Sequence, residues 1–154
     1  MSAEENLKKL GIQLPKAPQP VGAYLAYIKA KNLVFVSGQI SLRSNGDLIK
    51  GKIGLDLNLE QGHEAAQVCA INILSQIKLA CEGNLNKVKN CIKITGFVNS
   101  IDSFVDQPKV INGASELITQ VFGENGQHTR AAVSVNSLPL GAAVEVEAVF
   151  EVSE

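Results

Sequence analysis

A long stretch without proline, from Asn58 to Glu82, is the feature that most constrains how this chain can fold. Between Ala66 and Cys81, small and aliphatic residues recur at intervals of three and four. This spacing places them on one face of a helix. Asn58 is a favourable N-cap, and Gly83 is a favourable helix stop. The sequence therefore predicts one long helix whose apolar face packs against another layer.

Strand patterns lie on both sides of this helix. The runs Tyr24 to Ile28 and Leu33 to Ile40 are rich in β-forming residues and flank a short polar segment, which predicts a hairpin. Leu48 to Leu55 follows a turn and predicts a further strand. Apolar positions from Val88 to Val98 predict another strand beyond the helix.

Helix signals recur near both ends of the chain. Ser115 to Phe122 predicts a second helix that ends at Gly123. Near the N-terminus, Ser2 and Glu5 have the spacing of a capping box and predict a short helix. We expect residues 1–16 to form this helix and an extended lead-in, and residues 17–154 to form a single domain.

The last part of the chain reads as a hairpin. Arg130 to Val135 and Ala143 to Val152 alternate apolar and polar residues around a turn near Pro139. In that register, residue 134 faces residue 145 and residue 132 faces residue 147. The expected polar face comprises Arg130, Ser134, Glu145 and Glu147. The expected buried face comprises Ala131, Val133, Val135, Val144, Val146 and Phe150.

These elements predict an α+β fold, a mixed sheet with two helices on one face. The chain has 154 residues, about the size of one domain, and a net charge of −1. That charge gives no field to hold nucleic acid or an anionic membrane, and no apolar run approaches the ~20 residues that span a bilayer. We therefore expect a soluble, cytoplasmic protein. Cys69, Cys81 and Cys91 form no metal or disulfide motif and are expected to be reduced packing residues.

An arginine and a glutamate on one polar face can form a minimal site for an amino-acid-like substrate. The planar guanidinium of Arg130 suits a carboxylate, and Glu145 could activate water. The same pattern is also typical of a solvated sheet face with ordinary cross-strand ion pairs. The residues alone leave both readings open.

Three segments resemble the YjgF/YER057c/UK114 (Rid) family in order and spacing. They are 21–24, Val-Gly-Ala-Tyr; 34–40, Val-Phe-Val-Ser-Gly-Gln-Ile; and 130–148, which contains Leu-Pro and Val-Glu-Val-Glu-Ala. The resemblance spans nearly all of residues 17–152. Residues 108–115 and 128–130 resemble a longer branch of the family that carries an N-terminal helix.

The resemblance implies a chorismate-mutase-like fold, assembled as a homotrimer with three clefts between subunits. It implies hydrolysis of 2-aminoacrylate-type enamines or imines to a 2-keto acid and ammonia, with a small-molecule carboxylate as substrate. It implies neither a metal nor an organic cofactor. Some family members are also described as L-PSP endoribonucleases or translation inhibitors.

The resemblance also implies roles for individual residues that match family positions. Arg130 matches the arginine that clamps the substrate carboxylate, and Glu145 matches the acid that positions water. Tyr24 and Ser37 match positions that line the cleft, and Asn112 lies near another. Ala132 stands where many members have a cysteine that acts mainly through its backbone. Two further departures, Ala23 and Leu25, replace the residues that usually flank the tyrosine.

Arg130 and Glu145 would lie about four residues apart along the predicted hairpin, on the order of 13 Å. One small substrate cannot span that distance. Either the strands pair in a different register, or the two side chains meet across a subunit boundary. We predict the second, so that activity requires assembly.

Other candidate residues fit chemistry less well. His63 lacks the second histidine that a helical zinc site needs. His128 could line the rim of the cleft, but no proton-transfer role follows from its position. Ser37 lacks the flanking residues of a nucleophile elbow, so binding is the better role for it.

Two other functions remain open beside the deaminase. Ala132 and the altered tyrosine segment also fit a protein that binds a keto acid or an amino-acid metabolite without turnover. An endoribonuclease is disfavoured by the net charge of −1 and by an aromatic content of only 5%.

Overall fold

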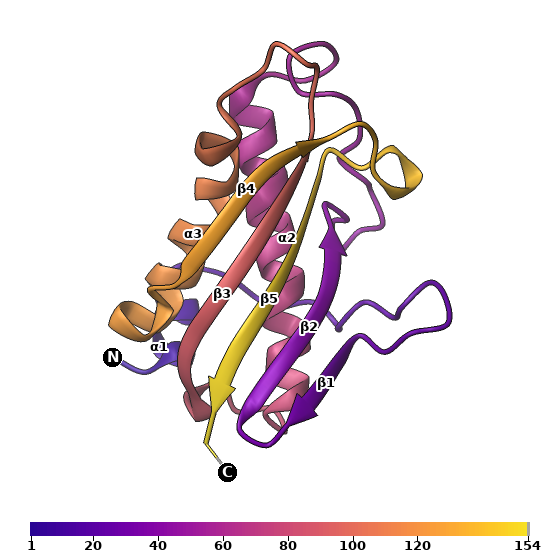
Figure 1. Ribbon diagram of the computed structural model, residues 1–154. Coiled ribbons are helices and arrows are strands. Elements are labelled where there is room, and N and C mark those ends of the chain that lie inside the picture. The colour runs from indigo at the N-terminus through magenta and orange to yellow at the C-terminus, as the bar shows by residue number, and fades with distance from the viewer. Residues whose placement is uncertain (154) are drawn as a thin grey trace.

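The computed structural model describes residues 1–153 and shows one mixed sheet with helices on one face (Figure 1). The strands are β1 (Tyr27–Ala30), β2 (Leu33–Ile40), β3 (Val88–Asn99), β4 (Thr129–Val135) and β5 (Val144–Val152). The α-helices are α1 (Ala3–Lys9), α2 (Leu59–Ala80) and α3 (Gln107–Phe122). Three short 3-10 helices complete the described chain: η1 (Leu85–Lys87), η2 (Gly123–Gly126) and η3 (Pro139–Gly141). No helix within this range is long and apolar enough to cross a membrane.

The sheet has the strand order β1-β2-β5-β3-β4. All neighbouring pairs are antiparallel except β3 and β4, which are parallel. A parallel pair needs a crossover, and α3 supplies it on the same face as α2. The opposite face of the sheet carries no helix and is called the open face below (Figure 1).

The predicted long helix is confirmed. Asn58 caps α2 because its side-chain Oδ1 accepts a hydrogen bond from the backbone N–H of Gln61, and Gln61 Oε1 accepts one from the backbone N–H of Asn58. The core between α2, α3 and the sheet includes Ile73, Ile94 and Phe150, none of which is exposed. The predicted hairpin is also confirmed, but β1 begins at Tyr27 and leaves Tyr24 in the preceding loop.

Two predicted elements differ from the structure. Residues 48–55 form no regular strand and make only isolated bridges, because Gly51 and Gly54 adopt positive φ angles of 124° and 93°. Helix α3 begins at Gln107 rather than Ser115. Pro108 is tolerated there because the first turn of a helix needs no backbone donor at that position.

The early start of α3 places Gly113 inside the helix, against α2. A Cβ atom at Gly113 would lie 2.0 Å from the carbonyl oxygen of His63. Glycine therefore permits the close contact between α2 and α3, which fixes how α3 lies over β4. His63 itself is partly exposed and contacts Glu116 of α3 at 3.3 Å, which links the two helices.

The predicted C-terminal hairpin is wrong. Strand β3 lies between β4 and β5, and the residues paired with Ile94 are Arg130 on one side and Ala148 on the other. Paired residues point to the same face of a sheet. Since Ile94 and Ala148 are buried under the helices, Arg130 also lies on the helix side. The segment 136–143 crosses the end of β3 instead of forming a tight turn.

This pairing changes the predicted faces of β4 but not those of β5. Val144, Val146 and Phe150 are buried as expected, and Glu145 and Glu147 lie on the open face. On β4 the assignment is reversed, because Val133 pairs with Phe97, whose other partner is Glu145. The set Ala131, Val133 and Val135 therefore lies on the open face, and the set Arg130, Ala132 and Ser134 lies on the helix side.

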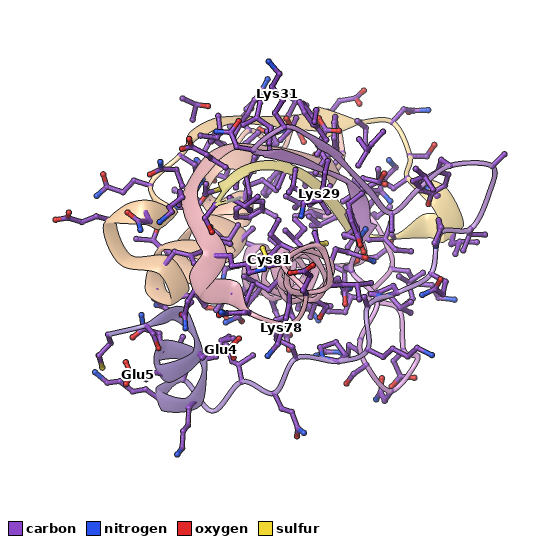
Figure 2. The ribbon with its side chains drawn as sticks, turned by 90° about the horizontal axis from the view of Figure 1, so that it is seen from below. Glu4, Glu5, Lys29, Lys31, Lys78 and Cys81 are labelled. Atoms are coloured by element: carbon purple, nitrogen blue, oxygen red, sulfur yellow. The ribbon has the colours of Figure 1, made fainter. Side chains whose placement is uncertain are left out.

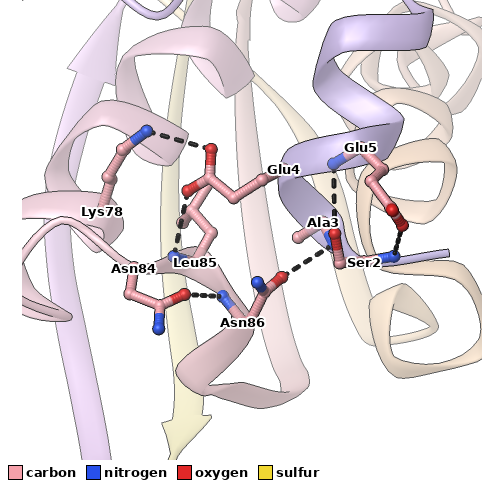
Figure 3. A network of polar contacts seen from close by, with 8 residues as sticks. All are labelled: Ser2, Ala3, Glu4, Glu5, Lys78, Asn84, Leu85 and Asn86. Atoms are coloured by element: carbon pink, nitrogen blue, oxygen red, sulfur yellow. Dashed lines mark hydrogen bonds and ion pairs between the residues drawn. The ribbon is translucent and has the colours of Figure 1, made fainter.

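Helix α1 docks against the lower end of α2 and α3. Figure 3 shows Glu4 accepting hydrogen bonds from Lys78 at 3.1 Å and from the backbone of Leu85 at 3.3 Å. Asn86 accepts a hydrogen bond from the backbone of Ala3 at 3.0 Å. The predicted capping box of Ser2 is present. These contacts anchor the N-terminal helix to the domain.

Seen from below, the carboxyl end of α2 is surrounded by polar groups (Figure 2). Lys29 of β1 donates to the carbonyl of Ala80 at 3.0 Å, which satisfies one of the unpaired carbonyls at the helix end. Cys81, beside it, is buried and free, as are Cys69 and Cys91. All three belong to the hydrophobic core, as the sequence predicted, and burial raises the pKa of each thiol.

Candidate functional site

The candidate residues fall into two groups on different parts of the sheet. Tyr24, Ser37 and Glu145 lie together beside β2 and β5. Arg130 and Asn112 lie together between the edge strand β4 and helix α3. We call these the acid half-site and the arginine half-site.

The acid half-site is a cavity of about 620 Å³ on the open face. Glu145 and Glu147 form its floor, together with the backbone of Gly38. Its rim is apolar and comes from two segments, 18–24 and 139–140. The rim residues are Pro18, Pro20, Val21, Tyr24, Pro139 and Leu140.

A β-bulge in β2 shapes this cavity. Val36 pairs with Ala148 and Gln39 with Val146, so Ser37 and Gly38 together oppose Glu147. An extra residue bends the strand and redirects neighbouring side chains. Ser37 donates its hydroxyl hydrogen to the carbonyl of Leu25 at 2.6 Å, which ties the loop bearing Tyr24 to the bulge.

Gly38 provides the space that the Glu145 side chain occupies. A Cβ atom at Gly38 would lie 2.4 Å from Glu145 Oε1 and 2.9 Å from its carboxyl carbon. Any side chain at this position would displace the carboxylate. The sequence contains no sign of this steric role for Gly38, because it depends on a contact with a residue of another strand.

Glu145 is half-buried, and its carboxylate receives no hydrogen bond from any residue within 1–153. Burial, and secondarily the Glu147 carboxylate, raise the pKa of Glu145. A carboxyl group with a raised pKa and no protein partner is suited to exchange protons with a bound molecule.

The arginine half-site is a hydrogen-bonded cluster. Arg130 Nη1 donates to Asn112 Oδ1 at 2.7 Å and to Ser115 Oγ at 3.2 Å. Ser115 also contacts His128 Nε2 at 2.9 Å, and His128 Nδ1 contacts the carbonyl of Gly126 at 2.6 Å. Ala132 follows on the same face of β4 and packs against the core.

Ser115 was not predicted as a site residue. Asn112 and Ser115 are three residues apart, which places both side chains on one face of a helix. That signal was hidden because the helix was predicted to begin at Ser115, with Asn112 outside it.

The two half-sites do not meet within one chain. Arg130 lies level with Ile94 of β3 and Glu145 level with Phe97, and β3 separates their two strands. Three residues along the sheet and two strand spacings across it amount to roughly 14 Å. The two side chains also leave opposite faces. The predicted separation is therefore found, although the hairpin from which it was predicted does not exist.

Within residues 1–153, no three histidine, cysteine, aspartate or glutamate side chains gather as a metal site would require.

Comparison with known proteins places this arrangement in a family. Residues 4–152 match the family model described as "YjgF/chorismate mutase-like, putative endoribonuclease". Protein TCP17 of Trypanosoma cruzi is 44% identical over 149 residues, which cover 96% of this chain and 92% of that protein. A 2-iminobutanoate/2-iminopropanoate deaminase of Dermatophagoides farinae is 28% identical over 140 residues, covering 90% of this chain and 92% of that protein.

A solved structure shares the whole fold. The protein Atu1372 of Agrobacterium tumefaciens, whose function is described as unknown, superposes with a TM-score of 0.90 at 43% identity. The match covers 98% of this chain and 94% of that one. The resemblance seen in the sequence is thus confirmed over nearly the full length. The chain belongs to the YjgF/chorismate mutase-like family, which also includes proteins named RutC and RidA.

Proposed function

We propose that this protein hydrolyses reactive enamines or imines of 2-keto acids, of the 2-aminoacrylate type, to the keto acid and ammonia. The observation that carries the proposal is the half-buried Glu145 carboxyl group. It has a raised pKa, has no hydrogen-bond donor within residues 1–153, and lies at the floor of a cavity. The relative from Dermatophagoides farinae, named as an imine deaminase, supports the same reaction class.

The reaction asks little of the protein. An enamine first becomes the imine, as its C3 gains a proton and its nitrogen loses one. Water then adds to C2 of the imine, so that a C–O bond forms, the C=N bond becomes single and the nitrogen gains a proton. The C–N bond then breaks as the carbonyl forms, and ammonia leaves. Glu145 would take a proton from the water and return it to the departing nitrogen. A raised pKa brings the carboxyl group closer to the range in which it can do both.

Arg130 would hold the substrate carboxylate. A guanidinium binds a carboxylate through two parallel hydrogen bonds and keeps its charge throughout the reaction. Tyr24, Ser37 and Asn112 would line the same site, and Ala132 would contribute through its backbone. Fixing the imine carbon beside an activated water supplies most of the rate enhancement that such a substrate needs.

We infer that the complete site forms between two copies of the chain. The arginine half-site lies at the edge strand β4 and the acid half-site over β2 and β5, so a ring of identical subunits can bring the arginine of one copy to the acid of the next. Apolar side chains on the open face support assembly, since Ile28, Phe35 and Val133 are 56%, 43% and 46% exposed. A homotrimer is the assembly that the family resemblance implies.

The test follows ammonia and pyruvate release while 2-aminoacrylate is generated in solution. The wild type is expected to accelerate release, and Arg130→Ala and Glu145→Gln are expected to lose that acceleration. Mass determination by light scattering is expected to give three chains per particle. A fully active monomer would refute the shared site, and a wild type no faster than buffer would refute the deaminase.

A second function has specific support. Ala132 replaces the usual cysteine, and Leu25, beside Tyr24, is 66% exposed at the loop. The altered site could bind a keto acid without turnover. Binding of 2-oxobutanoate that depends on Arg130, in a protein with no deaminase activity, would favour this reading. RNA cleavage that disappears in Arg130→Ala would instead favour the endoribonuclease in the family description.

A further inference from the structure

The hydrogen bonds of the arginine half-site form a continuous chain whose directions can be assigned. The carbonyl of Gly126 can only accept, so His128 Nδ1 carries a hydrogen. When the ring is neutral, its Nε2 is therefore bare and accepts the hydroxyl hydrogen of Ser115. The Ser115 oxygen accepts in turn from Arg130, whose guanidinium can only donate.

These hydrogen bonds use both hydrogens of one guanidinium nitrogen, Nη1. Nη1 carries two hydrogens, and these go to Asn112 and Ser115. Within residues 1–153, Arg130 makes no other hydrogen bond and no ion pair. Its Nε and Nη2 hydrogens, which lie side by side on one edge of the planar group, are therefore free. That edge matches the two oxygens of a carboxylate.

A second helical serine shows what Ser115 would do without His128. Ser75 of α2 donates its hydroxyl to the carbonyl of Ile71, four residues earlier, at 3.1 Å. This local bond is the common alternative for a serine inside a helix. Ser115 is directed away from that alternative by the acceptor on His128, which keeps its oxygen turned toward Arg130.

We propose that His128 and Ser115 are positioning residues for Arg130. They hold Nη1 so that the Nε and Nη2 edge, rather than the Nη1 and Nη2 end, receives the substrate carboxylate. The inference rests on the proposed function in one respect, namely that Arg130 binds a carboxylate. Beyond that function, it identifies two positioning residues and the edge of the guanidinium that receives the carboxylate.

Each variant tests one hydrogen bond between His128, Ser115 and Arg130. Ser115→Ala removes the link to Arg130. His128→Gln keeps an acceptor near the position of Nε2, whereas His128→Asn reaches only the position of Nδ1. Ser75→Ala is the matched control, because this serine makes a helical bond far from the site. Thermal melts of each variant report whether it is folded.

The measurements are the dissociation constant of 2-oxobutanoate, an unreactive keto acid, and the KM and kcat for the enamine. Ser115→Ala and His128→Asn are expected to weaken binding and raise KM about tenfold, with kcat little changed. His128→Gln and Ser75→Ala are expected to match the wild type. Nitrogen NMR of neutral His128 is expected to show a protonated Nδ1 and a bare Nε2.

Each outcome decides the matter. Binding by Ser115→Ala equal to that of the wild type, or a His128 ring protonated on Nε2 alone, would overturn the positioning role. Wild-type protein that binds no 2-oxobutanoate would overturn it as well. Absence of turnover combined with binding that depends on Ser115 would sustain the inference while refuting the deaminase, so the two failures can be told apart.

Discussion

The two half-sites differ in what their central charged group already contacts. Arg130 is held by Asn112 and Ser115, both from the same chain, and keeps one free edge. Glu145 lies in a cavity beside a second acid and receives no hydrogen bond from residues 1–153. The arginine half-site is thus preorganised to bind, whereas the acid half-site has a carboxyl group whose protonation can change. The proposed function assigns binding and proton transfer to these two separate parts of one sheet.

The largest expected effect tests whether one cleft combines the arginine half-site of one subunit with the acid half-site of another. Arg130→Ala and Glu145→Gln should each lower kcat/KM by roughly 100-fold or more. When the two inactive variants are unfolded together and refolded as mixed oligomers, about a quarter of the clefts should combine an intact arginine with an intact acid. Activity should then return to about that fraction of the wild-type value.

The control for this experiment is each variant refolded alone, which should stay inactive. Glu147→Gln serves as a matched variant one position removed on the same face. Mixed oligomers that remain inactive would place both groups in one subunit, and activity that survives Glu145→Gln but not Glu147→Gln would exchange the roles of the two acids.

The next effect probes the space reserved for Glu145. Gly38→Ala should lower kcat roughly 10- to 100-fold, because the added Cβ would lie 2.4 Å from Glu145 Oε1 and displace the carboxylate. Steady-state kinetics measure this change. Binding of 2-oxobutanoate through the arginine half-site should fall much less, and equal losses of binding and kcat would show that the two half-sites are not functionally separate.

A smaller effect concerns the pH at which the acid works. Glu147 contributes, after burial, to the raised pKa of Glu145. Glu147→Gln removes that repulsion and should move the acidic limb of the kcat profile to lower pH. Kinetics across the acidic range would measure the shift. A limb that moves to higher pH would mean that Glu147 stabilises the charged form of Glu145.

The smallest effect is on stability. A carboxyl group whose pKa is raised by folding contributes stability that is present below its unfolded pKa and is lost as pH rises through its folded pKa. Glu145→Gln should therefore stabilise the protein at neutral pH, by less than about 1 kcal/mol because solvent screens a half-exposed group. Denaturant melts at pH 7 and at low pH should show the gain only at pH 7.

The fold could be predicted where the signals are local. Asn58 and Gln61 cap α2, and Leu33 to Ile40 form β2, because these elements depend on nearby residues alone. Helix α3 was predicted too short, since Pro108 and Gly113 both suggest loop. Pro108 is tolerated in the first turn of α3, and Gly113 is needed for the contact with His63, which belongs to another helix.

The candidate site was predicted in part. The residues named from the sequence fall into two compact clusters, but the sequence could not show which face carries Arg130. Alternation along β4 is the same whichever strand pairs with it, and only the insertion of β3 between β4 and β5 decides the face. Ser115 and Gly38 were missed as site residues because their contacts, to Arg130 and Glu145, come from distant parts of the chain.

The sequence by itself determined the family, the long capped helix and the first hairpin, and it named the candidate arginine and acid. These follow from periodicity, capping and the order of short segments, all of which depend on residues that are close together in the sequence. Only the tertiary structure decided the strand order, the face from which Arg130 leaves the sheet, and the cavity at Glu145. The physical reason is that strand pairing joins residues far apart in the chain, and one inserted strand exchanges buried for exposed positions without changing any local preference.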